Sequence, residues 1–333
     1  MKIRYLIAGF LALCVILTYR YMYTMPIGNY DVLITGAAGF VGHHIMVKMP
    51  NAIGVDNFND YYDVSLKYKR AFLSGRVING DVCDEKLISN IIKNYDIKKV
   101  IHMAAQAGVR YSLKNPQAYV KSNVECFVHL LEVLKNTNIP LIYASSSSVY
   151  GKNTKVPFSE EDPVVQPASL YAATKRENEL LAHVYYNLYK QKSIGLRFFT
   201  VYGPMGRPDM AYYSFTKNIM DGTPINVYNY GDVSRDFTYI DDIVDGIIGC
   251  TTIDVEYEIL NLGRGQPHTV GKFIEIIEEA TGRKAIKKMM PMAKGDVLIT
   301  YANVSKAMKM IGYNPKVSLE EGINRFVEWY LQF

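Results

Sequence analysis

The chain has 333 residues, of which 49% are hydrophobic, so it is long enough to bury a full core in one large or two ordinary domains. Its formal charge of +5 comes from 37 basic and 32 acidic residues spread along the chain, without the basic tract that binding a phosphate backbone requires. We therefore expect a globular enzyme and do not expect nucleic acid as a partner.

The first hydrophobic segment is Tyr5–Tyr19, which contains no charge, follows Lys2 and Arg4, and is closed by Arg20. This pattern is typical of a signal sequence or signal anchor. No small-residue cleavage site follows it, so we expect residues 1–25 to form an uncleaved anchor. The resulting expectation is a single-pass membrane protein whose catalytic domain lies in a Golgi-like lumen. A buried N-terminal helix and a cytoplasmic protein are the alternatives.

From residue 30 to residue 200, short β-branched runs alternate with longer helical stretches, which is the pattern of a doubly wound parallel sheet. We therefore expect a Rossmann-type α/β domain over 30–200. The predicted strands are Asp31–Thr35, Ala52–Asp56, Arg76–Asn79, Lys99–Met103, Leu141–Ser145 and Ile194–Phe199. The predicted helices cover 40–49, 84–94, 116–136 and 168–191.

The pattern becomes less regular after Pro204. Residues 201–333 are therefore expected to form mainly a smaller α/β lobe that binds the substrate. Its predicted strands lie near 225–228 and 257–262, and its predicted helices near 241–250, 269–280, 303–310 and 318–331.

A glycine-rich turn, GAAGFVG (36–42), joins the first predicted strand directly to a helix. In such a turn the first glycine permits the tight bend, the second lets backbone N–H groups approach a pyrophosphate, and the third allows close helix packing. The helix N-terminus then faces the phosphates. The residues expected to bind the phosphates of a dinucleotide are Gly36, Gly39, Phe40, Val41 and Gly42.

An acidic residue, Asp56, ends the second predicted strand fourteen residues after Gly42. A carboxylate at this position accepts hydrogen bonds from ribose hydroxyls and disfavours a 2′-phosphate, so NAD is expected rather than NADP. Further residues at the carboxyl ends of the strands are expected to contact the adenosine half of the cofactor. They are Asn57, Asp81, Val82, Ala104 and Ala105.

Tyr171 and Lys175 are four residues apart in a predicted helix, which places the phenol and the ammonium on one face. A free tyrosine has a pKa near 10, so a nearby cation is needed before it can act as a base at neutral pH. Lys175 and a nicotinamide ring would supply that charge. On its own the pair would be two surface residues, but Ser146 follows a buried strand that ends at the same sheet edge.

The four cysteines, Cys14, Cys83, Cys126 and Cys250, stand far apart, with no CxxC pair and no histidine at metal-ligand spacing. We therefore expect buried thiols, with neither a disulfide framework nor a metal site.

Three features in this order resemble the extended short-chain dehydrogenases/reductases of the NAD-dependent epimerase/dehydratase family: the glycine turn, the serine run with Val149-Tyr150-Gly151, and Tyr171-x-x-x-Lys175. The resemblance covers residues 30–331. Within the family, longer strings are similar to UDP-glucuronate 4-epimerases. These are GVDNFNDYYDVSLKYKR (54–70), HMAAQAGVRYSLKNP (102–116), SLYAATK (169–175), LRFFTVYGPMGRPDM (196–210) and SRDFTYIDD (234–242).

The resemblance implies a hydride shuttle. Tyr171 would take the proton of the sugar 4-hydroxyl while C4 gives hydride to NAD, with Ser146 bound to the same oxygen. The 4-keto sugar would turn over and receive hydride on its other face. Lys175 would also bind the nicotinamide ribose, Asn123 would lie with the cofactor-binding residues, and Arg235 would pair with the UDP pyrophosphate.

The resemblance also helps to distinguish this chain from other enzyme classes of the family. Dehydratases carry Thr-Asp-Glu where this chain has Ser146-Ser147-Ser148. A uronate carboxylate needs a cation and hydroxyls, for which Arg207, Thr200 and Ser148 are the candidates. Arg110 is a weaker candidate, with a helix-surface arginine as the alternative.

The remaining alternatives are a UDP-glucose 4-epimerase, a UDP-glucuronate decarboxylase and a catalytically idle NAD-binding scaffold. The helices over 116–136 and 168–191 resemble those that pair subunits in this family, which implies a homodimer.

Overall fold

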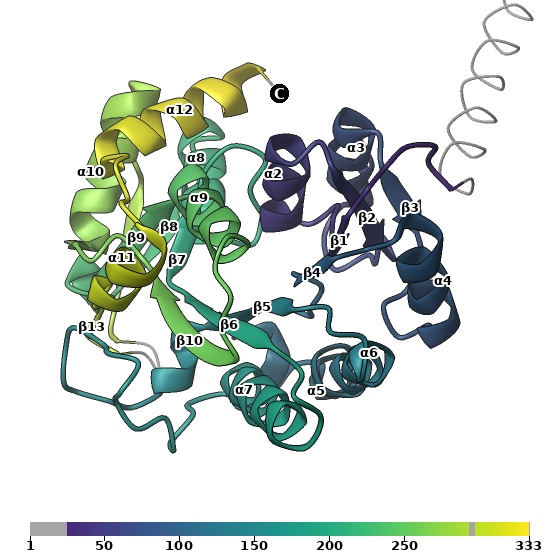
Figure 1. Ribbon diagram of the computed structural model, residues 1–333. Helices are drawn as coiled ribbons and strands as arrows, with labels where there is room; N and C mark the ends of the chain where they lie inside the picture. The colour runs from purple at the N-terminus through teal and green to yellow at the C-terminus, as the bar shows by residue number, and fades with distance from the viewer. Residues whose placement is uncertain (1–24, 293–296, 333) are drawn as a thin grey trace, which may run out of the picture.

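A parallel sheet of seven strands forms the centre of the protein. Figure 1 shows the protein as a computed structural model, which describes residues 25–292 and 297–332. The strand order is β10-β6-β5-β4-β1-β2-β3, which is the expected doubly wound arrangement. The strands are β1 (Val32–Thr35), β2 (Ala52–Asp56), β3 (Val77–Asn79), β4 (Lys99–His102), β5 (Leu141–Ser146), β6 (Ser193–Phe198) and β10 (Tyr257–Leu262).

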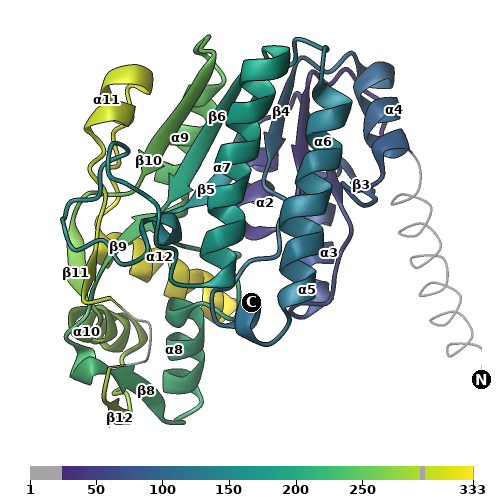
Figure 2. The same ribbon diagram turned by 90° about the horizontal axis from the view of Figure 1, so that it is seen from below.

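Helices cover both faces of this sheet (Figure 2). One core joins Leu33 and Ile53 of the sheet to helices α4, α6 and α7, and the other joins Val32 and Ile34 to α2, α3 and α9. Burial on both faces explains why β1 and β2 read as unbroken apolar runs. The helices are α2 (Phe40–Lys48), α3 (Val64–Ser74), α4 (Glu85–Tyr95), α6 (Cys126–Leu134), α7 (Leu170–Tyr189) and α9 (Ile240–Cys250).

The helix predicted over 116–136 has three parts: α5 (Pro116–Tyr119), a π-helical segment η2 (Val120–Glu125) and α6. A π-helix contains more residues per turn than an α-helix and often marks a functional site. Asn123 lies in this segment and is buried. The π-helical turn therefore contains the residue, Asn123, that contacts Gln106 in the segment after β4.

The second lobe lies beside the main sheet, at one end of the molecule (Figure 2). In its larger sheet β9 pairs with β11, β13 and β7, and in its smaller sheet β12 pairs with β8. Its strands are β7 (Thr200–Tyr202), β8 (Ile225–Tyr228), β9 (Ser234–Tyr239), β11 (Pro267–Thr269), β12 (Lys287–Met290) and β13 (Ile299–Thr300). Its helices are α8 (Ala211–Met220), α10 (Val270–Thr281), α11 (Ser305–Ile311) and α12 (Leu319–Gln332).

Residues after 200 contribute to both parts of the fold. The stretch 257–262, expected as a strand of the second lobe, is β10, and it pairs with β6 at the edge of the main sheet. Helix α9 also packs against α2, on the cofactor half of the molecule.

The expected membrane placement is wrong. No helix within residues 25–292 and 297–332 is both long enough and apolar enough to cross a bilayer, which overturns the expected single-pass protein with a lumenal catalytic domain. The anchor proposed for residues 1–25 lies, apart from Met25, outside the described residues.

Candidate active site

A cavity of about 510 Å³ runs along the carboxyl edge of the main sheet and reaches the second lobe. This volume lies within the usual range for ligand sites. Most of the side chains expected from the sequence line it. They are Gly36, Gly39, Phe40, Val41, Gly42, Asp56, Asn57, Asp81, Val82, Ala104, Ala105, Ser146, Ser148, Tyr171, Lys175, Thr200, Arg207 and Arg235.

Two of the expected residues do not line this cavity. Arg110 is exposed, and its guanidinium stacks over the ring of Tyr228 at 5.0 Å. Asn123 is buried behind the cavity wall, where it accepts from the backbone N of Gln106 at 2.7 Å and donates to the Thr174 hydroxyl at 3.1 Å. The structure thus makes Asn123 a positioning residue for the segment after β4 and places Arg110 on the surface.

The glycine turn is shaped for close approach of a phosphate. Gly36 has a φ of +69°, and a Cβ there would lie 2.6 Å from the backbone N of Ala104. A Cβ on Gly42 would lie 2.1 Å from the carbonyl oxygen of Gly36, so only glycine allows α2 to pack this closely. Gly39 caps α2 without a side-chain hydrogen bond, so the first N–H groups of the helix face the cleft without a side-chain acceptor.

Asp56, at the end of β2, is buried beside this turn. Its Oδ2 accepts from the backbone N of Ala38 at 3.0 Å and its Oδ1 from the backbone N of Phe58 at 2.8 Å. Burial raises the pKa of its carboxyl, while Lys67 and these backbone N–H groups oppose that shift. Each oxygen keeps a second lone pair for a ribose hydroxyl. The turn and this carboxylate together fit NAD.

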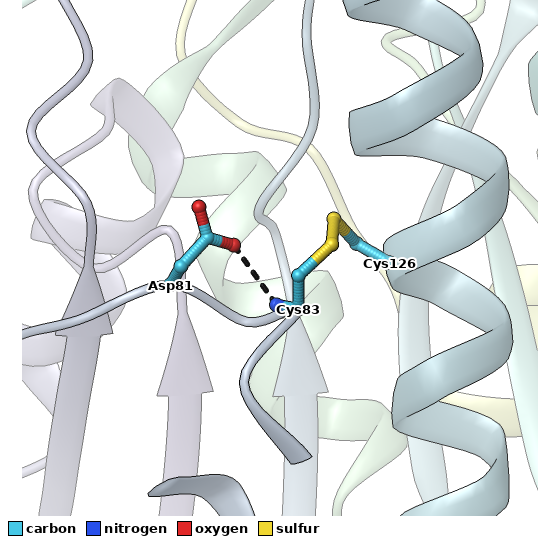
Figure 3. Close-up of side chains that lie close together, drawn as sticks. All are labelled: Asp81, Cys83 and Cys126. Atoms are coloured by element: carbon cyan, nitrogen blue, oxygen red, sulfur yellow. Dashed lines mark hydrogen bonds between the residues drawn. A yellow bond between two sulfur atoms is a disulfide. The ribbon is translucent and has the colours of Figure 1, made fainter.

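The loop after β3 contributes Asp81 and Val82 to the lining of the cavity. Figure 3 shows Asp81 and Cys83 of this loop beside Cys126. Asp81 accepts from Asn57 Nδ2 at 3.0 Å and from the backbone N of Cys83 at 2.9 Å. Cys83 forms a disulfide with Cys126 at the start of α6, with 4.4 Å between the Cα atoms. The expectation of free thiols is therefore wrong for this pair, whereas Cys250 is a buried free thiol and Cys14 lies outside the described residues.

One group among the described residues could hold a metal ion, namely Asp81, Cys83 and Cys126, whose ligand atoms lie within 4.8 Å of one another. The two sulfur atoms are bonded to each other, so neither is a thiolate that could ligate a cation.

The predicted catalytic residues come together at the ends of β5 and α7. Ser169 caps α7 by accepting from the backbone N of Ala172 at 3.1 Å, which places Tyr171 in the first turn. One turn later, Lys175 donates to the carbonyl oxygen of Ala144 on β5 at 2.8 Å. Ser146 ends β5, and its Oγ accepts from the Ser148 hydroxyl at 2.9 Å.

The pKa values of this group reflect burial. Burial raises the pKa of the Tyr171 phenol, while the hydrogen bond with Ser146 and the positive charge of Arg207 lower it. Burial lowers the pKa of the Lys175 ammonium to about 8. The sequence led us to expect Lys175 as the protein cation that acts on Tyr171, whereas in the structure Arg207 is the cation that lowers the pKa of this phenol.

Arg207 has an acidic partner, Asp209, that the sequence pattern did not reveal. Asp209 accepts from Arg207 Nε at 3.0 Å and from Arg207 Nη2 at 2.6 Å. The Tyr61 hydroxyl donates to the same carboxylate at 3.0 Å, and the Arg207 guanidinium lies 5.8 Å from the Tyr61 ring. These contacts orient Arg207 within the cleft.

The carboxylate of Glu179 lies beneath the catalytic residues. It accepts two hydrogen bonds from Arg197 on β6, at 2.8 and 2.9 Å, and one from the Ser145 hydroxyl at 2.7 Å. Burial tends to raise the pKa of Glu179, but these hydrogen bonds and the Arg197 charge outweigh it and lower that pKa. Glu179 belongs to the same helix as Tyr171, so the buried pair holds that helix to β5 and β6.

Arg70 connects the two halves of the site. It is fully buried in α3, and it donates to the carbonyl oxygen of Ala38 at 3.0 Å in the glycine turn. Its other terminal nitrogen donates to the carbonyl oxygens of Met205 at 2.6 Å and Gly206 at 3.1 Å, directly before Arg207. One guanidinium thus links the glycine turn to the segment that precedes Arg207.

Two further residues expected to bind the substrate, Thr200 and Arg235, come from strands of the second lobe. Thr200 begins β7 and Arg235 lies in β9, where its Nη1 donates to the carbonyl oxygens of Ser234 and Val297, both at 2.9 Å. Thr200, Arg207 and Ser148 all line the cavity near Tyr171.

Comparison with known proteins identifies the family. Residues 32–263 match the model of the NAD dependent epimerase/dehydratase family. The chain belongs to that family. The chain is similar to UDP-glucuronate 4-epimerase 1 of Arabidopsis thaliana, with 47% identity over 333 aligned residues, covering 92% of this chain and 78% of the relative. An uncharacterised protein of Methanocaldococcus jannaschii is 51% identical over 315 residues, covering 91% and 96%.

Among solved structures of this epimerase family, the chain is similar to UDP-glucuronic acid 4-epimerase from Bacillus cereus in complex with UDP-glucuronic acid and NAD. The TM-score is 0.85 at 32% sequence identity, and the match covers 90% of this chain and 99% of that chain. The family and fold expected from the sequence are therefore confirmed.

Proposed function

We propose that this protein is an NAD-dependent epimerase that inverts C4 of UDP-glucuronate to give UDP-galacturonate through a transient 4-keto sugar. The 47% sequence identity to the Arabidopsis epimerase and the structural similarity to the Bacillus cereus enzyme support this activity and NAD as the cofactor. Both relatives are named for this reaction.

The observation that carries the choice of substrate is the Arg207 guanidinium, which lines the same cavity as Tyr171 and lowers its pKa. In a uronate the carboxylate is attached to C5, next to the C4 hydroxyl. A cation near the catalytic phenol therefore lies where that carboxylate arrives when C4 is in place. Thr200 and Ser148 line the same cavity and offer hydroxyl donors to the carboxylate.

When bound, NAD supplies a reversible hydride acceptor for C4. Tyr171 takes the proton of the 4-hydroxyl as the hydride leaves and returns it after the sugar has turned over. Ser146, hydrogen-bonded with Tyr171, donates to the O4 atom in both states. Lys175, held by the carbonyl oxygen of Ala144, is placed to bind the nicotinamide ribose. Gly36, Gly39 and Gly42 let the backbone approach the pyrophosphate, and Asp56 accepts from the ribose.

The 4-keto sugar is a β-keto acid, so an epimerase must keep its carboxylate from leaving as carbon dioxide. Arg207, oriented by Asp209 and Tyr61, holds that carboxylate by charge-assisted hydrogen bonds. We infer that these hydrogen bonds hold the carboxylate so that the C5–C6 bond does not align with the π orbital of the 4-keto group. Without this alignment the carboxylate does not leave readily, which favours epimerisation over decarboxylation. The cluster Ser146-Ser147-Ser148 offers no carboxyl acid, which argues against dehydration.

Product analysis tests the proposal. Purified protein with NAD and UDP-glucuronate is expected to give UDP-galacturonate, identified by chromatography and NMR. Tyr171→Phe is expected to slow the reaction by about 10² to 10⁴-fold, whereas Tyr230→Phe, at an exposed ring, serves as the control. Carbon dioxide with UDP-xylose or a pentos-4-ulose as the main product would contradict the epimerase.

We also infer a homodimer. Helix α7 exposes Leu180, Val184 and Leu188 in one stripe with a spacing of four, and Val120 of η2 is exposed on the adjoining helix. Pairing these two helices with their copies would bury the stripe. Val184→Glu with Leu188→Glu is expected to give monomers by light scattering. Leu331→Glu, on α12, is the control, and a dimer that survives the double change contradicts the interface.

A further inference from the structure

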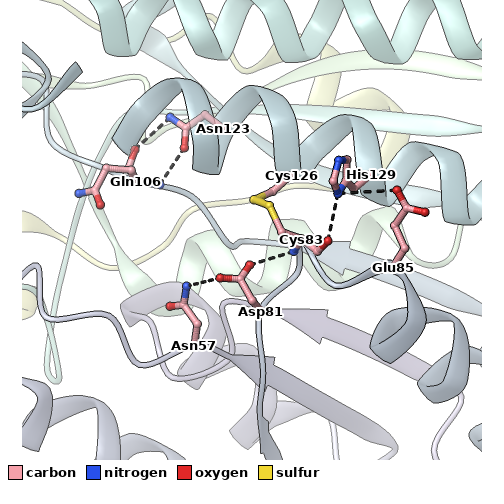
Figure 4. The surroundings of a disulfide bond; sticks show 8 residues. All are labelled: Asn57, Asp81, Cys83, Glu85, Gln106, Asn123, Cys126 and His129. Atoms are coloured by element: carbon pink, nitrogen blue, oxygen red, sulfur yellow. Dashed lines mark hydrogen bonds and ion pairs between the residues drawn. A yellow bond between two sulfur atoms is a disulfide. The ribbon is translucent and has the colours of Figure 1, made fainter. Parts of the chain in front are cut away.

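The Cys83–Cys126 disulfide adjoins the cavity, because Cys126 is one of the residues that line it. Figure 4 shows the residues around the bond. Cys83 follows β3 and is partly exposed, whereas Cys126 begins α6, is buried at 3% exposure and lines the cavity. The bond thus joins two segments 43 residues apart that both face the cleft.

Both joined segments carry groups placed for the adenosine half of NAD. On one side, Asp81 accepts from the backbone N of Cys83 and from Asn57, which directly follows the ribose-binding Asp56. On the other side, Asn123, one turn before Cys126, holds both backbone polar groups of Gln106, at 2.7 and 3.0 Å. The disulfide therefore sets the spacing between the loop after β3 and the helix that supports the loop after β4.

The loop after β3 has other attachments that do not depend on the disulfide. His129 Nδ1 lies 3.0 Å from the carbonyl oxygen of Cys83 and 3.6 Å from a Glu85 carboxylate oxygen, and Gly80 donates to the carbonyl oxygen of Asp56 at 3.0 Å. Breaking the disulfide would thus leave the loop folded but less firmly placed. The expected consequence is a graded change in binding rather than unfolding.

We propose that Cys83 and Cys126 form a thiol–disulfide exchange site for dithiol reductants, and that the oxidised pair binds NAD more tightly than the reduced pair. The inference rests on the proposed binding of NAD in this cleft.

The exchange takes place in two steps. A thiolate of the dithiol attacks the Sγ atom of the partly exposed Cys83, the Cys83–Cys126 bond breaks, and Cys126 leaves as a thiolate that takes a proton. The second thiol of the reductant then attacks its own mixed disulfide and releases Cys83 as a thiol. The protein gains two electrons and two protons, and the dithiol becomes a disulfide. Exchange with a disulfide oxidant reverses both steps.

Binding and redox state are linked in both directions. If the disulfide preorganises the adenosine wall, its reduction weakens NAD binding, and bound NAD must disfavour reduction by the same factor. Bound NAD would also cover the cavity wall at Cys126. The expected coupling is at least about fivefold in the dissociation constant.

The experiment measures NAD binding by titration calorimetry on the full chain freed of cofactor. One sample is untreated and the other is reduced with dithiothreitol, and peptide mass mapping verifies the state of Cys83 and Cys126. EDTA is present throughout because reduction frees two sulfur atoms beside the Asp81 carboxylate. Reduction is expected to raise the dissociation constant, and NAD is expected to slow thiol labelling of the pair.

Two variants serve as controls. Cys83→Ser is expected to bind NAD like the reduced protein and to ignore dithiothreitol, whereas Cys250→Ser, which alters a buried free thiol in α9, should respond like the wild type. Equal affinity in both redox states, or a pair that dithiothreitol leaves bonded in the cofactor-free protein, overturns the inference. Failure of the oxidised wild type and of Cys250→Ser to bind NAD at all would instead overturn the proposed cofactor site.

Discussion

The guanidinium of Arg207 and the carboxylate of Asp209, two residues apart, form a two-pronged ion pair in the substrate side of the cleft, with donor–acceptor distances of 3.0 and 2.6 Å. The pair occupies two of the five N–H donors of the arginine. Because Tyr61 also binds this carboxylate, the cation is held in one orientation before any substrate arrives.

Arg207→Met is expected to lower kcat/KM for UDP-glucuronate by about 10- to 100-fold, because a hydrogen bond to a charged group contributes roughly 1.5–3 kcal/mol. The dissociation constant for NAD should stay unchanged. Steady-state kinetics with calorimetry measures both values. Arg325→Met, which removes an exposed arginine of α12, is the control. An unaltered kcat/KM would show that Arg207 does not bind the uronate.

Lys175 should make stability depend on pH. Its pKa is about 8 in the folded protein and 10.5 when unperturbed, so the unfolded chain binds more protons between these values and the free energy of unfolding rises with pH there. Below pH 8 both states carry the proton, and burying the ammonium costs the folded state about 3 kcal/mol.

Lys175→Met is therefore expected to raise the free energy of unfolding of the cofactor-free protein at pH 7, and the gain should shrink toward pH 10. Urea unfolding of variant and wild type at both pH values measures this difference. Lys86→Met, on the exposed face of α4, serves as the control. The same gain at pH 7 and pH 10 would rule out a depressed pKa for Lys175.

Gly42→Ala tests the packing of the phosphate-binding turn. The added Cβ would lie 2.1 Å from the Gly36 carbonyl oxygen, so α2 must move away from β1. We expect a loss of about 1–3 kcal/mol in the free energy of unfolding and about tenfold weaker NAD binding. Gly271→Ala, in the first turn of α10, meets no atom closer than 3.6 Å and is the matched control. Equal NAD affinity in both variants would refute this role of Gly42.

Arg70→Met is expected to lower the free energy of unfolding by at least about 3 kcal/mol, because buried carbonyl oxygens of Ala38, Met205 and Gly206 lose their donor. Both the dissociation constant for NAD and KM for the sugar nucleotide should rise, since the residue joins the two halves of the site. Arg70→Lys should restore part of the free energy of unfolding, but it should not restore both the dissociation constant for NAD and KM for the sugar nucleotide. A variant that changes stability alone would show that Arg70 has no positioning role.

Short-range patterns predicted most strands of the main sheet and many of the residues that line the cavity at its carboxyl edge. The runs that form β1 and β2 are apolar because both faces of the sheet are buried, and Tyr171 and Lys175 meet Ser146 because a strand and a helix end at one edge. Helix α3 was missed, although Asp63 caps its start by accepting from Ser65 and Gly75 ends it in a left-handed conformation. These capping residues were a usable signal.

Contacts between distant segments could not be predicted in the same way. Cys83 and Cys126 are 43 residues apart, and spacing alone does not decide whether such a pair bonds. Arg110 carries the charge expected of a substrate ligand, but only the fold shows that it stacks on Tyr228 outside the cavity. Asn123 was assigned to the cofactor, and its burial behind Gln106 depends on the π-helical turn of η2.

The position of β10 has a consequence for how the protein can be made and divided. Its residues, Tyr257–Leu262, complete the main sheet beside β6, yet they emerge from the ribosome only after β7, β8 and β9 of the second lobe. A fragment ending near residue 200 would leave the backbone of β6 as an open edge, ready to pair with other chains. The two lobes therefore cannot be separated by cutting the chain near residue 200: a gene fragment that ends there would not encode β10, the edge strand that covers β6.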